Sequence, residues 1–264
     1  MTDPGGRYVA LGSSFAAGPG IPPLVDRAAL RSGRNYPHLL AERLGLPLVD
    51  VTCSGATTAQ LRHARQPTLA GRVPPQVEAV TADTTLVTIT AGGNDLGYLG
   101  ALTSAGLRGT LAGRLPEALA RRLRSTVAVP APGAFAEVRT SLAALVAEVR
   151  RRAPDARVVL VDYLTVLGRH ATPATVPLTA EQIAAGREIA AGLDAVFAGA
   201  AADAGADLVV ASGPSAEHGA GSPEPWIGGT ALGVPVLGGA VPFHPTAAGM
   251  RAVADLVAAR IGVS

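Results

Sequence analysis

The stretch Tyr8-Val9-Ala10-Leu11-Gly12-Ser13-Ser14-Phe15 runs from apolar residues into a glycine and two serines. A short apolar run that ends in turn residues is typical of a strand buried on both faces of a parallel sheet. Further runs of this kind are each bounded by Gly, Pro or polar residues. They are 46–52, 85–90, 157–162 and 207–211. We therefore predict strands at 8–11 and at these four ranges.

Helical patterns separate the later strands. One helix precedes Pro154 and has an apolar stripe at helical spacing: Val138, Leu142, Leu145, Val146 and Val149. Another is predicted to open at Thr179 with Gln182 three residues later, the spacing of a capping box. The last is predicted to start after His244 with Pro245 in its first turn. Its expected buried residues are Met250, Val253, Val257 and Ile261.

Alternating strands and helices predict an α/β fold. We expect a three-layer α/β/α sandwich with a mostly parallel, flavodoxin-like doubly wound sheet. No linker or internal repeat divides the 264 residues, so we expect a single domain over 1–264. Two segments lack this regular pattern, 91–132 and 212–243, and the second is rich in Gly and Pro. Long irregular segments in compact domains are often functional.

The composition excludes several classes of protein. Cys53 is the only cysteine, so an intramolecular disulfide and a cysteine-based zinc site are impossible. The chain has no lysine, which excludes a phosphate-binding loop of the G-x-x-x-x-G-K-[ST] type. The net charge of +2 comes from scattered arginines, and a nucleic-acid partner is not expected. His38 and His63 lack metal-ligand spacing, so neither a metal nor a cofactor is expected.

The chain offers no candidate for membrane insertion. No run approaches the roughly 20 apolar residues of a membrane-spanning helix. The segment Met1-Thr2-Asp3-Pro4-Gly5-Gly6 lacks the apolar core of a signal peptide. We expect a cytoplasmic protein, with secretion from a longer precursor as the alternative. The sequence does not indicate an oligomeric state.

Polar residues follow three of the predicted strands at the points where these strands end. The segment 12–18 follows the first, 52–58 the second and 91–95 the third, while 243–245 precedes the last helix. Ligands of open α/β sheets bind outside the carboxyl ends of the strands. Four residues of these segments could therefore meet at one edge of the sheet: Ser14, Gly55, Asn94 and His244.

Each of these residues alone has an ordinary structural interpretation. Ser14 and Asn94 could cap helices, Gly55 could occupy a turn with positive φ, and His244 could pack at a helix start. Together they supply a nucleophile, a base, a backbone N–H donor and an amide donor. Acyl transfer needs these groups, and their joint occurrence favours that chemistry.

The blocks resemble those of the SGNH hydrolases, also called the GDSL esterase/lipase family. Residues 8–15 resemble the family's first block, and Cys53-Ser54-Gly55-Ala56-Thr57 resembles the second. Gly92-Gly93-Asn94-Asp95 matches the third block, and Phe243-His244-Pro245 resembles the last, so the blocks follow the family's order. The resemblance implies ester hydrolysis through an acyl-enzyme, with a small-molecule or lipid ester as substrate. It implies these roles: Ser14 as nucleophile, His244 as base, and an oxyanion hole of Ser14, Gly55 and Asn94.

Two positions depart from the family pattern. Ser13 stands where an aspartate is usual, next to the nucleophile. Val241 stands three residues before His244, where the acid of the triad is usual. We expect the main-chain carbonyl of Val241 to orient His244, which gives a Ser-His dyad. Glu217 and Glu224 are the competing acids.

The residues that contact the substrate have weaker signals in the sequence than the catalytic residues. The stretch around Pro225-Trp226 resembles a loop of actinobacterial members, so Trp226 is expected to line the substrate pocket, with core packing as the alternative. Leu96, Leu99 and Leu102 could contact an acyl chain or only pack in a helix. The alternative function is ligand binding: a protein with the SGNH fold and weakened catalytic activity would bind acyl or glycan ligands.

Overall fold

The computed structural model describes residues 6–116, 119, 125–229, 239 and 241–263. Within them the central sheet has five strands, all in parallel pairs. They are β1 (Arg7–Gly12), β4 (Leu48–Asp50), β7 (Thr84–Thr90), β8 (Arg157–Val161) and β9 (Asp207–Val209). Their spatial order is β4-β1-β7-β8-β9, the flavodoxin-like arrangement. The predicted fold class and strands are confirmed.

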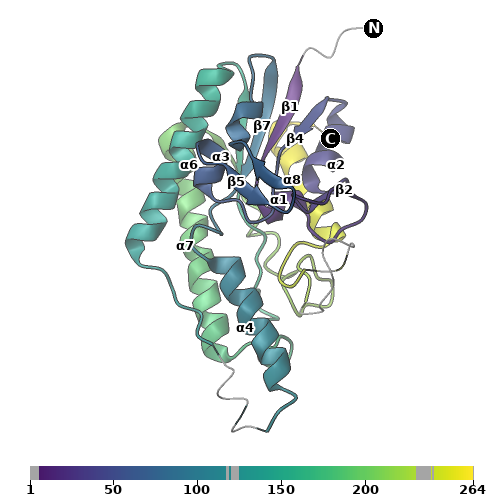
Figure 1. Cartoon of the computed structure of the whole chain (residues 1–264), viewed down its shortest axis with the longest axis vertical. Coiled ribbons are helices and arrows are strands. Elements are labelled where there is room, and N and C mark those ends of the chain that lie inside the picture. Colours follow the sequence, from purple (N-terminus) through teal and green to yellow (C-terminus); the bar gives the residue numbers. More distant parts are fainter. Residues whose placement is uncertain (1–5, 117–118, 120–124, 230–238, 240, 264) are drawn as a thin grey trace.

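Helices cover both faces of this sheet (Figure 1). One layer holds α2 (Tyr36–Leu44) and α8 (Ala247–Ile261), and the other holds α3 (Thr58–Arg62), α6 (Pro132–Arg152) and α7 (Ala180–Ala204). Helix α4 (Tyr98–Ala112) packs beside α7 and extends away from the sheet. The other elements are α1 (Ser14–Ala17), the 3-10 helix η1 (Gln76–Ala79), and the hairpins β2 (Leu24–Asp26)–β3 (Arg31–Ser32) and β5 (Gln66–Thr68)–β6 (Gly71–Val73).

The long helices largely follow their predicted patterns. In α6 the predicted apolar stripe is buried, and in α7 Thr179 and Gln182 form the expected capping box. Helix α8 begins later than expected, because the hydroxyl of Thr246 accepts the Gly249 N–H at 3.2 Å and caps it. Pro245 lies outside the helix in a bridge with Ile227. The predicted place of Pro245 in the first turn is therefore wrong.

The end of β1 is held in a fixed position. Its residues Tyr8 to Leu11 are fully buried. The side chain of Gln76 spans the last residue of the strand: Oε1 accepts the Gly12 N–H at 2.7 Å, and Nε2 donates to the Gly12 carbonyl at 3.0 Å. A Cβ at Gly12 would lie 2.8 Å from the Thr90 carbonyl oxygen, so only glycine fits there. These contacts place the residues that follow, Ser13 and Ser14.

A buried carboxylate joins the ends of β8 and β9. Asp162 accepts hydrogen bonds from the backbone N–H of Ala211 and from both the N–H (3.0 Å) and the hydroxyl (2.8 Å) of Ser212. Burial nevertheless raises the pKa of Asp162 to about 6, because removal from water penalises the charged form more than these donors favour it.

This carboxyl makes stability depend on pH in a defined direction. An unfolded aspartate has a pKa of about 4, so the folded protein binds this proton more tightly. The stabilisation is complete below about pH 4 and is lost as the pH rises through about 6. The wild type loses this stabilisation as the pH rises, and Asp162→Asn does not. We therefore expect the free energy of unfolding of Asp162→Asn, relative to that of the wild type, to increase by on the order of 2 kcal/mol from about pH 4 to about pH 7. Urea denaturation at both pH values measures this change, and a pH-independent difference would contradict it.

Candidate active site

Ser14 and His244 meet at the carboxyl end of β1. Ser14 is the first residue of α1 and its side chain is buried. His244 Nε2 lies 2.9 Å from Ser14 Oγ, although 230 positions separate the two residues in the chain. An imidazole nitrogen at this distance is within hydrogen-bond reach of a serine hydroxyl, the geometry that a nucleophile and its base require.

The other ring nitrogen of His244 is held by a backbone carbonyl. Nδ1 lies 2.8 Å from the carbonyl oxygen of Pro242, which can only accept, so Nδ1 carries the proton in the neutral ring. The expectation that the Val241 carbonyl orients His244 is wrong. Val241 instead accepts the backbone N–H of His244 at 3.4 Å. The neighbouring Pro242 carbonyl is therefore the one that meets the ring.

A tight turn explains this difference. The bond from the His244 N–H to Val241 closes a four-residue turn, with Pro242 second and Phe243 third. Phe243 has φ of 57°, and a positive φ at the third position is typical of a type II turn. A phenylalanine in this left-handed region is unusual, and full burial of its side chain holds it there.

The competing acids lie elsewhere. The Glu217 carboxylate forms an ion pair with Arg169 and lies 3.4 Å from His170 Nε2. Glu224 offers its backbone carbonyl to Nδ1 of His218 at 2.8 Å. Within the described ranges, no carboxylate forms a hydrogen bond or ion pair with His244.

Burial sets the protonation of His244. Removal from water lowers the pKa of the imidazole, and the bond to the Pro242 carbonyl offsets this only in part. The ring of Phe15 lies 5.7 Å from that of His244, centre to centre, and also contacts Tyr163 at 4.7 Å. The neutral form, which can accept a proton from Ser14, is thus favoured near neutral pH.

The second and third predicted blocks are joined beside this pair. Asn94, which follows β7, donates from Nδ2 to the Ala56 carbonyl at 2.8 Å. The carboxylate of Asp95 accepts the Thr58 N–H at 3.1 Å and its hydroxyl. Gly55 lies on the loop between β4 and α3, and its φ of 82° is one that glycine adopts without strain.

Hydrogen-bond donors remain free at this point. An amide nitrogen has two hydrogens, so the bond to Ala56 leaves Asn94 with one more to donate. The backbone N–H groups of Ser14 and Gly55 have no acceptor in the described part of the chain. Ser14 is buried, and a free backbone donor at a buried position indicates a place for a ligand, because such groups are almost always paired. Gly55 is exposed, so its N–H is accessible to water or to a ligand.

Ser14, Gly55, Asn94 and His244 line one cavity of about 540 Å³. The structure thus brings together all four residues predicted from the sequence motifs. The volume is typical of a site for a small molecule. Among the leucines considered for acyl contacts, Leu99 lines the cavity, whereas Leu96 and Leu102 belong to the core.

Several residues of this cavity were not predicted. Helix α4 supplies one wall, and Pro19 and Leu30 come from the segment after α1. Arg108 also lines the cavity, four residues after Ser104 and eight after Gly100, and so it lies on the helix face that these two residues present to the cavity. Gly100 and Ser104 were not predicted to line a site, so the sequence offers no signal that identifies Arg108. The role of Pro242 depends on the φ of Phe243, for which the sequence offers no signal.

Trp226 lies outside the wall of this cavity. Its ring stacks on His218, with centroids 4.2 Å apart and planes within 8°. Its backbone carbonyl accepts the Thr246 N–H at 2.8 Å. Trp226 therefore supports the segment between His244 and α8 and does not face the space beside Ser14.

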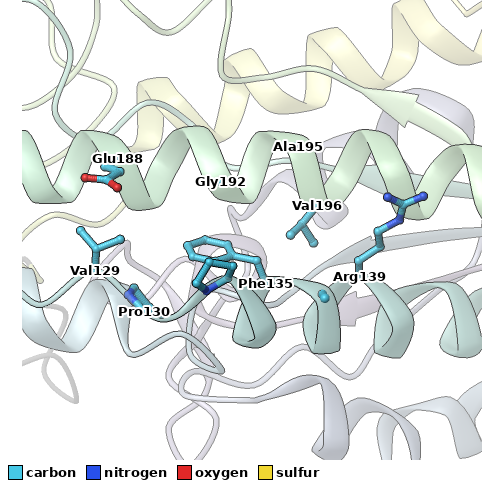
Figure 2. Close-up of a pocket in the computed structure, with 10 residues that line it drawn as sticks. Val129, Pro130, Phe135, Arg139, Glu188, Gly192, Ala195 and Val196 are labelled. Carbon is cyan, nitrogen blue, oxygen red and sulfur yellow. The ribbon is translucent and has the colours of Figure 1, made fainter.

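A second cavity, of about 470 Å³, lies between α6 and α7 (Figure 2). In this view Phe135 points from α6 toward Gly192 of α7, where a Cβ would lie 2.4 Å from the ring. None of the four predicted catalytic residues lines it.

In the described chain, we find no cluster of three or more His, Cys, Asp and Glu suited to a metal ion. The described helices also include none with the length and apolarity needed to cross a membrane.

Comparison with known proteins identifies the family of this chain. Residues 10–252 match the GDSL-like lipase/acylhydrolase family, and the chain belongs to that family. Lipase 2 of Streptomyces coelicolor is 37% identical over 257 residues, which cover 94% of this chain and 83% of the lipase. A lipase of Streptomyces rimosus is 31% identical, over 92% of this chain and 81% of that protein. The chain is thus a carboxylic ester hydrolase, as the motifs predicted.

Solved structures show the same fold. Phospholipase A1 from Streptomyces albidoflavus superposes with a TM-score of 0.71 at 25% identity, over 97% of this chain and 99% of that enzyme. The extracellular lipase of Streptomyces rimosus gives a TM-score of 0.68 at 26% identity, with the same coverage. Since this relative is extracellular, the cytoplasmic location of the present chain stays a prediction.

The lowered pKa of His244 predicts activity on the acid side of neutrality. The ordinary pKa of a histidine is about 6.5. We expect the acidic limb of kcat/KM to have its midpoint below that value, because the ring stays neutral to lower pH. A pH series with a 4-nitrophenyl ester measures it, with recovery of activity at neutral pH as the control for unfolding. A midpoint above about 6.5 would show that burial does not control this group.

Proposed function

We propose that the protein hydrolyses carboxylic esters through an acyl-enzyme formed on Ser14. The 2.9 Å contact between His244 Nε2 and Ser14 Oγ carries this proposal. As Oγ attacks the ester carbonyl, His244 takes its proton, and a tetrahedral intermediate forms. When the C–O bond to the alcohol breaks, His244 gives the proton to the leaving oxygen. Water then repeats these steps on the acyl-enzyme, which releases the acid and restores Ser14.

Three donors hold the negative oxygen of the tetrahedral intermediate in this proposal. They are the backbone N–H groups of Ser14 and Gly55 and the second amide hydrogen of Asn94. The bond from Asn94 to the Ala56 carbonyl supports this role, because it restrains the amide before the substrate arrives. Donors that are already positioned need no reorganisation during the reaction.

A dyad rather than a triad performs the proton transfers in this proposal. The Pro242 carbonyl keeps the proton on Nδ1, so Nε2 has the free lone pair that faces Ser14. A carbonyl has no full charge with which to stabilise imidazolium, so His244 is a weaker base than in a triad. The missing carboxylate is the one observation that favours the second candidate, a binding protein for acyl or glycan ligands.

Covalent labelling separates these two candidates. A fluorophosphonate reacts with an activated serine, so we expect one label on Ser14 of the wild type, located by mass spectrometry. Ser14→Ala should keep its circular dichroism spectrum and lose the label together with hydrolysis of 4-nitrophenyl esters. A folded wild type that is neither labelled nor active would support the binding protein.

The amide of Asn94 is expected to act on the chemical step. We predict that Asn94→Ala folds normally and loses about 10²- to 10³-fold in kcat, because one oxyanion donor is removed. Steady-state kinetics with a 4-nitrophenyl ester measure this loss. Turnover close to wild type in a folded variant would exclude Asn94 from the oxyanion hole.

The two acids that do not contact His244 test the dyad. The double variant Glu217→Gln/Glu224→Gln is expected to retain wild-type kcat and KM, because the structure pairs Glu217 with Arg169. A fall in kcat of tenfold or more, with an unchanged thermal midpoint, would assign one of these acids to the proton transfer.

A further inference from the structure

Helix α4 begins at the catalytic residues. The Gly97 N–H donates to the Asn94 carbonyl at 3.1 Å, and the Tyr98 N–H donates to the Gly93 carbonyl at 3.0 Å. The first turn of α4 is therefore anchored to the segment that carries the oxyanion amide. Leu99, in this turn, already lines the cavity that holds Ser14.

The same face of α4 continues along the cavity. Its lining residues recur every three to four positions, and they are Leu99, Gly100, Thr103, Ser104, Leu107 and Arg108. From Gly100 to Arg108 the helix rises about 12 Å, at 1.5 Å per residue. The cavity wall thus runs from the reacting groups to Arg108.

The interval between the catalytic residues and Arg108 is largely apolar. Leu99 and Leu107 contribute from α4, and Leu30 and Val241 line the cavity from other segments. A ligand that fills this interval is expected to present mainly apolar groups to it, because polar groups that do not reach the hydroxyls of Thr103 or Ser104 would lose hydration there without compensation.

Arg108 is the one cavity residue with a permanent charge among those described. Its side chain is exposed and forms no ion pair or hydrogen bond with a described residue, whereas Arg139, for example, is paired with both oxygens of Asp203. No acidic residue lines the cavity in the described part of the chain. The far end of the site is therefore positive and attracts anions.

We infer that the natural substrate is an ester with an anionic group, a carboxylate or a phosphate, which Arg108 binds at the far end of the cavity. The inference rests on the proposed hydrolysis at Ser14 and adds a class of substrate to it. The substrate has three parts: the ester at Ser14, an apolar spacer along α4, and the anion at Arg108. A guanidinium forms paired hydrogen bonds with either anion, so both share one mode of recognition.

Paired substrates that differ only in the anion test this inference. The acyl side is probed with 4-nitrophenyl hydrogen suberate against 4-nitrophenyl octanoate. The alcohol side is probed with 8-(phosphonooxy)octyl acetate against octyl acetate, in which eight methylene groups separate the ester from the phosphate. We expect Arg108→Gln to lower kcat/KM about five- to tenfold for the anionic member of at least one pair, and less than about twofold for its neutral partner. The pair that responds shows on which side of the ester the anion lies.

Arg114→Gln is the matched control. Arg114 is also exposed and follows α4, but it does not line the cavity. It should leave the ratio of kcat/KM within each pair unchanged, and added salt should weaken only the preference that depends on Arg108. Equal effects of Arg108→Gln on both members of both pairs, or the same change with Arg114→Gln, would overturn the inference. Hydrolysis of the neutral esters in that case would leave the proposed function standing, whereas no hydrolysis of any ester would overturn both.

Discussion

The parallel pairing of β1 with both β4 and β7 is the constraint on which the site depends. Because neighbouring parallel strands end at the same edge, this pairing brings Ser14, Gly55 and Asn94 together from three distant parts of the chain. Gly12 pairs with Thr90 in the last register position, so β1 and β7 end at the same height along the strand direction, and the segments that follow them begin side by side. A shift of this register would separate Ser14 from Asn94 and turn the buried side chains of β1 to the opposite face.

Neutral hydrogen bonds hold the reacting groups in place. The amide of Gln76 holds the strand end before Ser14, the carbonyl of Ala56 holds Asn94, and the carbonyl of Pro242 holds His244. Buried charges carry a desolvation cost that peptide and amide groups largely avoid. The site thus gains its geometry from dipoles, and the left-handed backbones of Phe243 and of Leu30 in the cavity wall are its strained positions.

Much of the fold and the site could be predicted from local sequence. The apolar runs of the strands and the helical spacing of the α6 stripe are visible in the sequence itself. Ser14, Gly55 and Asn94 follow predicted strands, and His244 precedes the last predicted helix. Contacts set by backbone angles or tertiary packing could not be predicted. Pro242 replaces Val241 beside His244 because of the φ of Phe243, and the hairpins β2–β3 and β5–β6 are too short to show a period. The single domain stays a prediction.

The contact between Ser14 and His244 also couples activity to the order of folding. Ser14, the proposed nucleophile, lies in the first element pair of the chain, and His244, its proposed base, lies directly before the last helix. During synthesis the first strands leave the ribosome long before α8, and β1 must wait for β7 to pair on its second side. In the proposed mechanism, hydrolytic competence is then acquired only when the C-terminal helix docks. An immature chain would carry a serine without its base and would be unable to attack cellular esters before folding is complete.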